Sequence, residues 1–280
     1  MSNIAVEIEN LSFYYEKGVE ILKDINLSIM QGEFFALLGS NGAGKSTLLK
    51  LINGLLKEYG GVIKIFGKDI RSINRDNLFR QVCTVFQDPN DQLFALTVFD
   101  DISFGPRNMG LSEKEVKNRV FDALKSVGLE GFENRAIKTL SYGQKKRLCI
   151  AGVLAMSPQI MLMDEPLSGL DPMGVRDIAV LLKKLNKEKE LTIIMATHEV
   201  DLIPLYVDRV AILSKGKITR MGEPAHVFSC SEEVHNAKLR MPYIAKLMEQ
   251  LKSDGVFDYE KIPLTVGEAK KEILKKIQHR

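Results

Sequence analysis

The stretch that most constrains the fold of this chain is a glycine-rich segment that fits the pattern G-x-x-x-x-G-K-[ST]. It consists of Gly39, Ser40, Asn41, Gly42, Ala43, Gly44, Lys45, Ser46 and Thr47. The apolar run 34–38 before it is typical of a buried parallel strand, and residues 48–52 after it are mainly helix formers. A loop between such a strand and such a helix directs backbone N–H groups inward, where the helix adds its positive N-terminal end.

This segment therefore predicts a phosphate cradle for a purine nucleotide. In the cradle, Lys45 reaches the β- and γ-phosphates, and the hydroxyl of Ser46 ligates Mg²⁺. The alternative is a structural glycine-rich loop that holds no ligand. The complete match to the pattern, between a strand and a helix, disfavours that alternative.

Composition narrows the class of protein further. The 280 residues carry a net charge of +3 that is spread along the sequence, which gives no electrostatic case for a nucleic-acid groove. The three cysteines, Cys83, Cys149 and Cys230, are far apart and lack metal-ligand spacing, so we expect reduced thiols in a cytosolic protein. The N-terminus shows no signal-peptide pattern, and the longest apolar run, 148–156, is too short to cross a bilayer. We expect any membrane role to depend on a partner.

Hydrophobic patterning predicts two kinds of strand. Alternation at 5–8, 25–29 and 62–66 is typical of a half-solvated antiparallel sheet, whereas continuous apolar runs such as 82–86 and 191–196 are typical of buried parallel strands. Together with the glycine-rich loop, these runs predict an α/β fold of the P-loop NTPase class. The aromatic residues Phe13, Tyr14 and Tyr15 could be core residues or could stack on a base, and the pattern favours the core.

Polar side chains follow three of the predicted parallel strands. Gln87 comes after the run 82–86, Asp164 and Glu165 after the run 160–163, and His198 after the run 191–196. Open α/β sheets bind ligands at the carboxyl ends of their strands, and carboxylates there suit Mg²⁺ and an attacking water. Asp164 could instead cap a turn, and a lone histidine is more often structural. The shared sheet edge favours a functional role for both residues.

Three helix starts are predicted from capping patterns. Ser112 with Glu115 and Ser141 with Gln144 form capping boxes, and Asp171 precedes a proline at the first position of a helix. A fourth pattern, Thr265 with Glu268, predicts a last helix in a C-terminal region of mixed charge. We expect the lysines of that helix to face water.

Taken together, these residues resemble the ATP-binding subunits of ABC transporters. The resemblance covers about residues 4–238 and rests on 39–47, Gln87, Leu140–Gln144, Ile160–Glu165, Ser168–Asp171 and His198, in the family's order. Tyr142 stands where the family usually has Gly, while Ser141 and Gly143 keep the family's residues. The segments 86–94 and 104–108 resemble the cobalt/nickel and energy-coupling-factor importers of metals and vitamins.

The resemblance implies a mostly parallel core sheet, an antiparallel β subdomain and an inserted α-helical subdomain. The ATP-binding domain would span 4–238, with the helical insert at about 95–157, and 239–280 would form a C-terminal helical extension. Leu93 and Phe94 would either pack under the insert or line a groove for a helix of a membrane subunit.

The resemblance also implies roles for individual residues, with ATP and Mg²⁺ as cofactors. Tyr15, or else Tyr14, would stack on adenine. Asp164 would hold Mg²⁺ through water, Glu165 would polarise the attacking water, and His198 would contact the γ-phosphate. Gln87 would link the γ-phosphate and its metal to the helical insert. The remaining nucleotide contacts would be Ser141, Gly143, Gln144 and Asp171, of which Ser141, Gly143 and Gln144 would act on ATP held by another protomer.

The implied partners are a second ATPase subunit, a transmembrane coupling subunit and a substrate-binding membrane subunit, with no nucleic acid. The second ATPase subunit would be an identical chain or a close paralogue, and the complex would place this chain at the cytoplasmic face of the cell membrane as a peripheral subunit. The rival hypothesis is a soluble ABC ATPase that acts on nucleic acid or ribosomes, but this chain has one cassette and no heptad run. A regulatory, non-catalytic cassette would have lost Glu165 or His198, and both are present.

Overall fold

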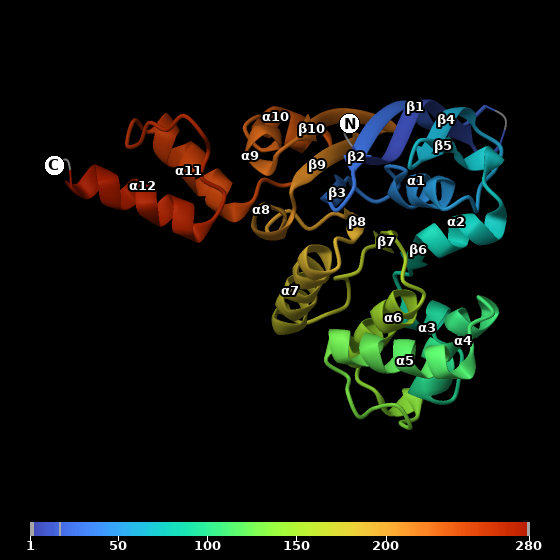
Figure 1. The fold of residues 1–280 in the computed structure, drawn as a ribbon. Coiled ribbons are helices and arrows are strands. Elements are labelled where there is room, and N and C mark those ends of the chain that lie inside the picture. Colours follow the sequence, from blue (N-terminus) through green and yellow to red (C-terminus); the bar gives the residue numbers. More distant parts are fainter. Residues whose placement is uncertain (1–2, 17, 279–280) are drawn as a thin grey trace.

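The computed structural model describes residues 3–16 and 18–278, which form two β-sheets and the helices that pack against them (Figure 1). The strands are β1 (Ile4–Tyr14), β2 (Glu20–Met30), β3 (Phe34–Leu38), β4 (Gly60–Ile65), β5 (Lys68–Asp69), β6 (Val82–Val85), β7 (Ile160–Asp164), β8 (Thr192–Thr197), β9 (Arg209–Ser214) and β10 (Lys217–Gly222). The helices are α1 (Lys45–Ile52), α2 (Arg75–Gln81), α3 (Pro89–Gln92), α4 (Val98–Asn108), α5 (Glu113–Val127), α6 (Tyr142–Ala155), α7 (Pro172–Glu188), α8 (Ile203–Tyr206), α9 (Pro224–Val227), α10 (Ser231–Asn236), α11 (Tyr243–Ser253) and α12 (Val266–Gln278), with 3₁₀ turns η1 (Ile70–Ser72) and η2 (Ile137–Thr139).

The larger sheet has six strands in the order β10-β9-β3-β8-β7-β6. The strands from β9 to β6 are parallel, and β10 pairs antiparallel with β9. Because parallel strands end at one edge, the carboxyl ends of β3, β6, β7 and β8 lie along the same side of the sheet. The predicted α/β fold with a mostly parallel core sheet is confirmed.

The central strand β3 explains why its sequence is apolar at every position. All five of its side chains are buried. Phe34 and Leu38 pack in a cluster with α4–α7, whereas Phe35 and Leu37 pack in a second cluster with α1 and the smaller sheet. A strand covered on both faces has no solvent side, so the alternation seen in β1 disappears.

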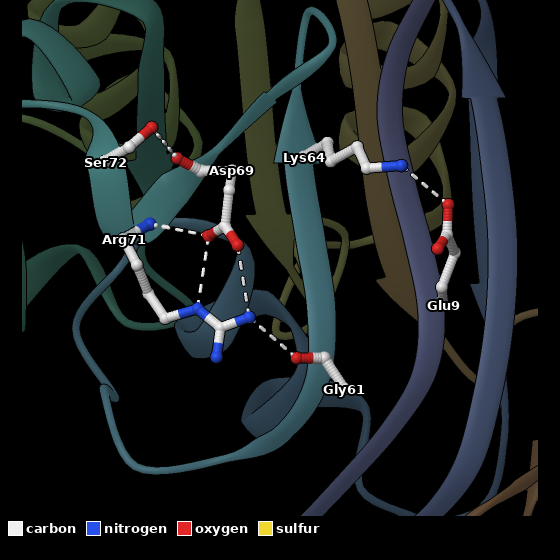
Figure 2. Close-up of polar contacts among 6 residues, drawn as sticks. All are labelled: Glu9, Gly61, Lys64, Asp69, Arg71 and Ser72. Atoms are coloured by element: carbon white, nitrogen blue, oxygen red, sulfur yellow. Dashed lines mark hydrogen bonds and ion pairs between the residues drawn. The ribbon is translucent and has the colours of Figure 1, made fainter.

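The smaller sheet is antiparallel, in the order β2-β1-β4-β5. Ion pairs tie its outer face together, as Figure 2 shows: Lys64 on β4 pairs with Glu9 at 2.7 Å, and Arg71 pairs with Asp69 at 3.1 Å. Arg71 also donates to the carbonyl of Gly61 at 2.8 Å. These partly exposed pairs fix local geometry more than they add stability. The predicted antiparallel sheet is therefore present beside the phosphate loop.

Helices α4, α5 and α6 pack on one another below the larger sheet (Figure 1). Both predicted capping boxes form: Ser112 with Glu115 opens α5, and Ser141 with Gln144 opens α6. In each box, the side chain of the first residue accepts the backbone N–H of the third helical residue, whose own side chain accepts in return. The start of α6 is thus fixed locally, before any contact with another molecule.

The last two helices, α11 and α12, reach away from the sheets (Figure 1). Thr265 and Glu268 cap α12 as predicted. Of its apolar residues, Ala269 is buried but Ile277 is 63% exposed, so the apolar face is only partly covered. Within residues 3–16 and 18–278, no helix combines the length and apolarity that a bilayer crossing requires.

Candidate nucleotide site

A cavity of about 440 Å³ opens at the carboxyl edge of the larger sheet, around the glycine-rich loop. Most residues that line it were predicted site residues. The lining consists of Tyr15, Ile21, Ser40, Asn41, Gly42, Gly44, Lys45, Ser46, Thr47, Gln87, Asp164 and Glu165. The loop after β3, the end of β7 and the residue after β6 therefore converge on one space, as the shared strand edge predicts.

The loop needs glycine at its two ends. A Cβ on Gly39 would lie 2.6 Å from the carbonyl oxygen of Leu213, so no side chain fits there. Gly44 has φ = 107°, a conformation that strains any other residue, and α1 begins directly after it at Lys45. The loop thus turns tightly into a helix N-terminus, which suits an anion with several oxygens.

Lys45 is buried, with 6% of its surface exposed, and lies between the loop and β7. Its ammonium donates to the carbonyl of Gly39 at 2.7 Å and pairs with Oε1 of Glu165 at 3.2 Å. The predicted phosphate ligand and the predicted catalytic carboxylate therefore hold each other.

Glu165 connects this pair to His198. Its backbone adopts φ = 45°, an uncommon conformation for a residue with a side chain, and its N–H donates to the carbonyl of Ala196 on β8. Nδ1 of His198 lies 3.0 Å from Oε2 of Glu165. Oε1 is buried and accepts no hydrogen bond from the described residues, and the ammonium of Lys45 lies 3.2 Å from it. His198 does not line the cavity itself but reaches it through the carboxylate.

The cavity offers a fitting set of oxygens for Mg²⁺. Ser46, the second residue of α1, is exposed, and Asp164 at the end of β7 lines the same cavity. One hydroxyl and one carboxylate do not make a complete cage, and no group of three or more metal-ligating acidic, histidine or cysteine side chains occurs in the described part of the chain. Mg²⁺ commonly completes its six oxygens from water and substrate phosphates, so these residues fit an ion that arrives with the nucleotide.

The aromatic residues before the loop divide between core and site. Phe13 is buried as expected, but Tyr14 and Tyr15 are 54% and 57% exposed, so the expectation of a core role is wrong for both tyrosines. The strand β1 alternates its side chains, which turns Phe13 inward and Tyr14 outward. Tyr15 lies in the cavity lining, with its hydroxyl 3.3 Å from Oγ1 of Thr47, and Tyr14 does not.

The other predicted nucleotide contacts do not line this cavity. Ser141, Gly143 and Gln144 lie at the start of α6, and Asp171 caps α7 through the N–H of Gly174. Ser141 and Asp171 are exposed. Their side chains are thus available to a second molecule and do not complete the site of their own chain.

One lining residue was missed by sequence analysis. Ile21 of β2 offers the cavity an apolar surface, and nothing in its local pattern distinguishes it from the other apolar residues of that strand.

A second, mainly apolar cavity of about 380 Å³ lies between β6 and the helices α4 and α6. Phe94 and Phe104 line it and stay 66% and 50% exposed, whereas Leu93 is half-buried against the core. Leu93 therefore packs against the core, whereas Phe94 lines a groove that could receive a helix of a membrane subunit.

The ABC transporter family model matches residues 22–168. The chain belongs to this family. It is similar to the energy-coupling factor transporter ATP-binding protein EcfA2 of Clostridium perfringens, with 44% identity over 275 residues that cover 98% of this chain and 96% of the relative. The predicted ABC-type ATPase, coupled to transport, is confirmed, and so is the resemblance to the cobalt and energy-coupling-factor type.

Two solved structures are similar in fold. One is cbiO1 from Clostridium perfringens, described as part of the ABC transporter complex cbiONQ, with a TM-score of 0.78 and 44% identity over 88% of this chain and 99% of that one. The other is the dimeric cassette MJ0796 in a post-hydrolysis state with ADP and Pi, with a TM-score of 0.69 and 32% identity over 78% of this chain and 98% of that one.

Proposed function

We propose that this chain is the ATP-hydrolysing subunit of an importer of cobalt or nickel ions, or of a vitamin-type micronutrient, at the cytoplasmic face of the cell membrane. The observation that carries the proposal is the cavity in which Lys45, Glu165 and the glycine-rich loop meet. The similarity to an energy-coupling factor transporter subunit and to cbiO1 supports the importer class. Residues 4–238 form the ATP-binding domain in this proposal, 95–157 its helical insert, and 239–280 an extension.

The pair between Lys45 and Glu165 sets the order of events at the site. When ATP binds, the ammonium of Lys45 turns to its β- and γ-phosphates, which releases Oε1 of Glu165 toward the cavity. Glu165 then orients water and accepts its proton, while His198 holds the other carboxylate oxygen in place. Tyr15 offers its exposed ring to adenine.

Mg²⁺, held by Ser46 and through water by Asp164 and Gln87, would neutralise charge on the phosphate oxygens. Gln87 directly follows the edge strand β6 and is an exposed residue of the cavity lining. It would therefore contact the γ-phosphate when ATP is bound. Its loop continues into α3 and the helical insert, which gives the nucleotide a route to that insert.

A second ATPase subunit completes the site. The open face of the cavity leaves the γ-phosphate in contact with water, and the capped start of α6 presents Ser141 and Gly143 with a positive helix end. The same start from another protomer, with its Asp171 loop, would close the cavity. The partner is an identical chain or a close paralogue, and the dimeric solved cassette with ADP and Pi supports such a pair.

The apolar groove beside Phe94 and Phe104 is the proposed contact with a transmembrane coupling subunit, which works with a substrate-binding membrane subunit. An amphipathic helix fits a groove of this kind, and Asp88 and Asp91 of the adjoining loop and α3 favour basic residues beside its apolar face.

Light scattering on the Glu165→Gln protein tests the proposal. This variant keeps the phosphate loop but loses the proton acceptor, so we expect Mg-ATP to convert the monomer into a dimer. Replacing Ser141 with Arg in the same background should prevent dimerisation, because a bulky cation would face the helix start and Mg²⁺ of the partner. Ser72→Arg adds the same charge at an exposed residue of η1 that does not line the nucleotide cavity, and is the matched control. A molecular mass that does not respond to nucleotide would refute the proposed dimer.

A further inference from the structure

Lys146, on the second turn of α6, is an unusual buried cation. Only 2% of its surface is exposed, and no carboxylate within the described residues forms an ion pair with it. Its ammonium donates to the backbone carbonyl of Gln87 at 2.5 Å and lies 5.6 Å from the ring centre of Tyr142. Burial lowers the pKa of Lys146, because the ammonium is removed from water.

A second bond ties the same loop to the same helix. The side chain of Gln92 donates to the carbonyl of Cys149 on α6 at 2.9 Å and accepts the N–H of Phe86 at 3.0 Å. The segment 86–92 is therefore held to α6 at two points, one on each side of α3's start. A shift of α6 relative to the sheet has to move Gln87 as well.

Tyr142 gives the helix a third contact, with the segment that follows Glu165. A Cβ placed on Gly169 would come within 3.0–3.2 Å of two ring carbons and the hydroxyl oxygen of Tyr142. The ring thus packs directly on the backbone of Gly169, between the catalytic carboxylate and the cap of α7. Together, Lys146 and Tyr142 connect one helix to the two loops that border the nucleotide cavity.

We infer that Lys146, supported by the ring of Tyr142, is a positioning residue: its bond to the backbone of Gln87 fixes where Gln87 lies relative to α6. The inference rests on the proposed function, in which the start of α6 contacts the nucleotide of the partner subunit. Lys146 then transmits the position that α6 adopts on that nucleotide to the glutamine of its own site. Lys146 does not line the nucleotide cavity and bonds to the backbone of Gln87, so it acts on the site through that residue.

Lys146→Met separates positioning from packing. Met has a similar unbranched shape and cannot donate a hydrogen bond, and it removes the penalty for burying an ammonium. We expect kcat for Mg-ATP hydrolysis to fall about tenfold, since a hydrogen bond from a charged donor is lost. The Kd for ATP should stay within about twofold of the parent value, and Tm should not fall. Lys145→Met makes the same change one position earlier, where the side chain has no hydrogen-bond or ion-pair partner among the described residues, and should keep the parent kcat.

Tyr142 variants provide an independent readout. Tyr142→Phe keeps the ring on Gly169 and beneath Lys146 and should hydrolyse ATP like the parent, whereas Tyr142→Ala should lower kcat with little change in Kd. This difference would not arise if the hydroxyl alone mattered.

The inference is overturned if the parent is active and Lys146→Met matches its kcat, or if kcat falls only together with Tm and ATP affinity. It is also overturned if Tyr142→Ala and Tyr142→Phe behave alike. A parent protein that neither hydrolyses ATP nor dimerises would refute the proposed function itself and the inference with it, and is distinguished by the absence of activity before any substitution.

Discussion

The pair between Lys45 and Glu165 makes a prediction about stability without nucleotide. Both side chains are buried, with 6% and 10% exposed, so Lys45→Ala leaves a carboxylate without its cation in a poorly solvated place. Removing one member of a buried pair typically costs about 3–5 kcal/mol. His198 still contacts Oε2, and the cavity admits water to Oε1 once Lys45 is truncated, so we expect a loss of about 3 kcal/mol, the lower end of that range.

The assay is a double-mutant cycle in which urea unfolding of nucleotide-free protein gives the free energy of unfolding of the parent, the two single variants and the double variant. Glu165→Gln should cost less than Lys45→Ala, because Lys45 keeps its bond to the carbonyl of Gly39. The double variant should be more stable than the sum of the single losses predicts, by about 1 kcal/mol or more. Nucleotide has to be removed first, since a ligand that binds only the native state raises apparent stability. Additive losses would show that the two side chains do not stabilise each other.

Three further outcomes are expected. Glu165→Gln should keep ATP binding but lower turnover at least about a hundredfold, as measured by phosphate release, because positioned acid–base catalysis is worth that much; near-parental turnover would remove Glu165 from its role. Asp91→Lys reverses an exposed charge on α3, so ATPase activity and stability, within about 0.5 kcal/mol, should persist while solute uptake by the assembled complex falls; unchanged uptake would place the membrane contact elsewhere. Lys146 binds its proton less tightly in the folded chain than in the unfolded one, so stability should rise with pH between its lowered pKa and the ordinary value of 10.5, and Lys146→Met should flatten that rise in urea titrations.

The interpretation of the Lys146 pH slope depends on the groups that face it. Asp88, Glu165 and Cys149 act electrostatically on its ammonium, and the ring centre of Tyr142 lies 5.6 Å from it. Burial raises the pKa of Cys149 to about 12, so that thiol stays neutral across the range. Tyr142 titrates in the same range, because burial raises the pKa of its phenol above the ordinary value of 10.0 and stability then falls as pH rises above that value. The comparison is therefore made in a Tyr142→Phe background. A slope that survives in Lys146→Met would assign the effect to a different part of the chain.

The sequence was sufficient to predict that distant residues share one cavity. Gln87, Asp164 and the glycine-rich loop each follow a run of buried apolar residues, and parallel strands place such ends at one edge. The caps at Ser112 and Ser141 were also predictable, because each depends on residues only three positions apart.

Contacts between residues far apart in the chain were not predictable in the same way. The ion pair of Lys45 with Glu165 and the bond from Lys146 to Gln87 depend on where two helices lie on the sheet, and no local period encodes that. Tyr14, the last residue of β1, illustrates a different limit. An aromatic triplet looks apolar throughout, but a strand with one covered face buries every second side chain, so Tyr14 is directed outward.

The burial of β3 on both faces has a consequence for how strongly a nucleotide can be held. Opening this strand would disrupt both hydrophobic clusters at once, so its amides should exchange with deuterium only through global unfolding. The phosphate loop is anchored directly to this strand and to a helix that packs against the same sheet. Most of its conformational entropy is therefore lost when the chain folds and not when the ligand arrives, and the free energy of the phosphate contacts remains available for affinity.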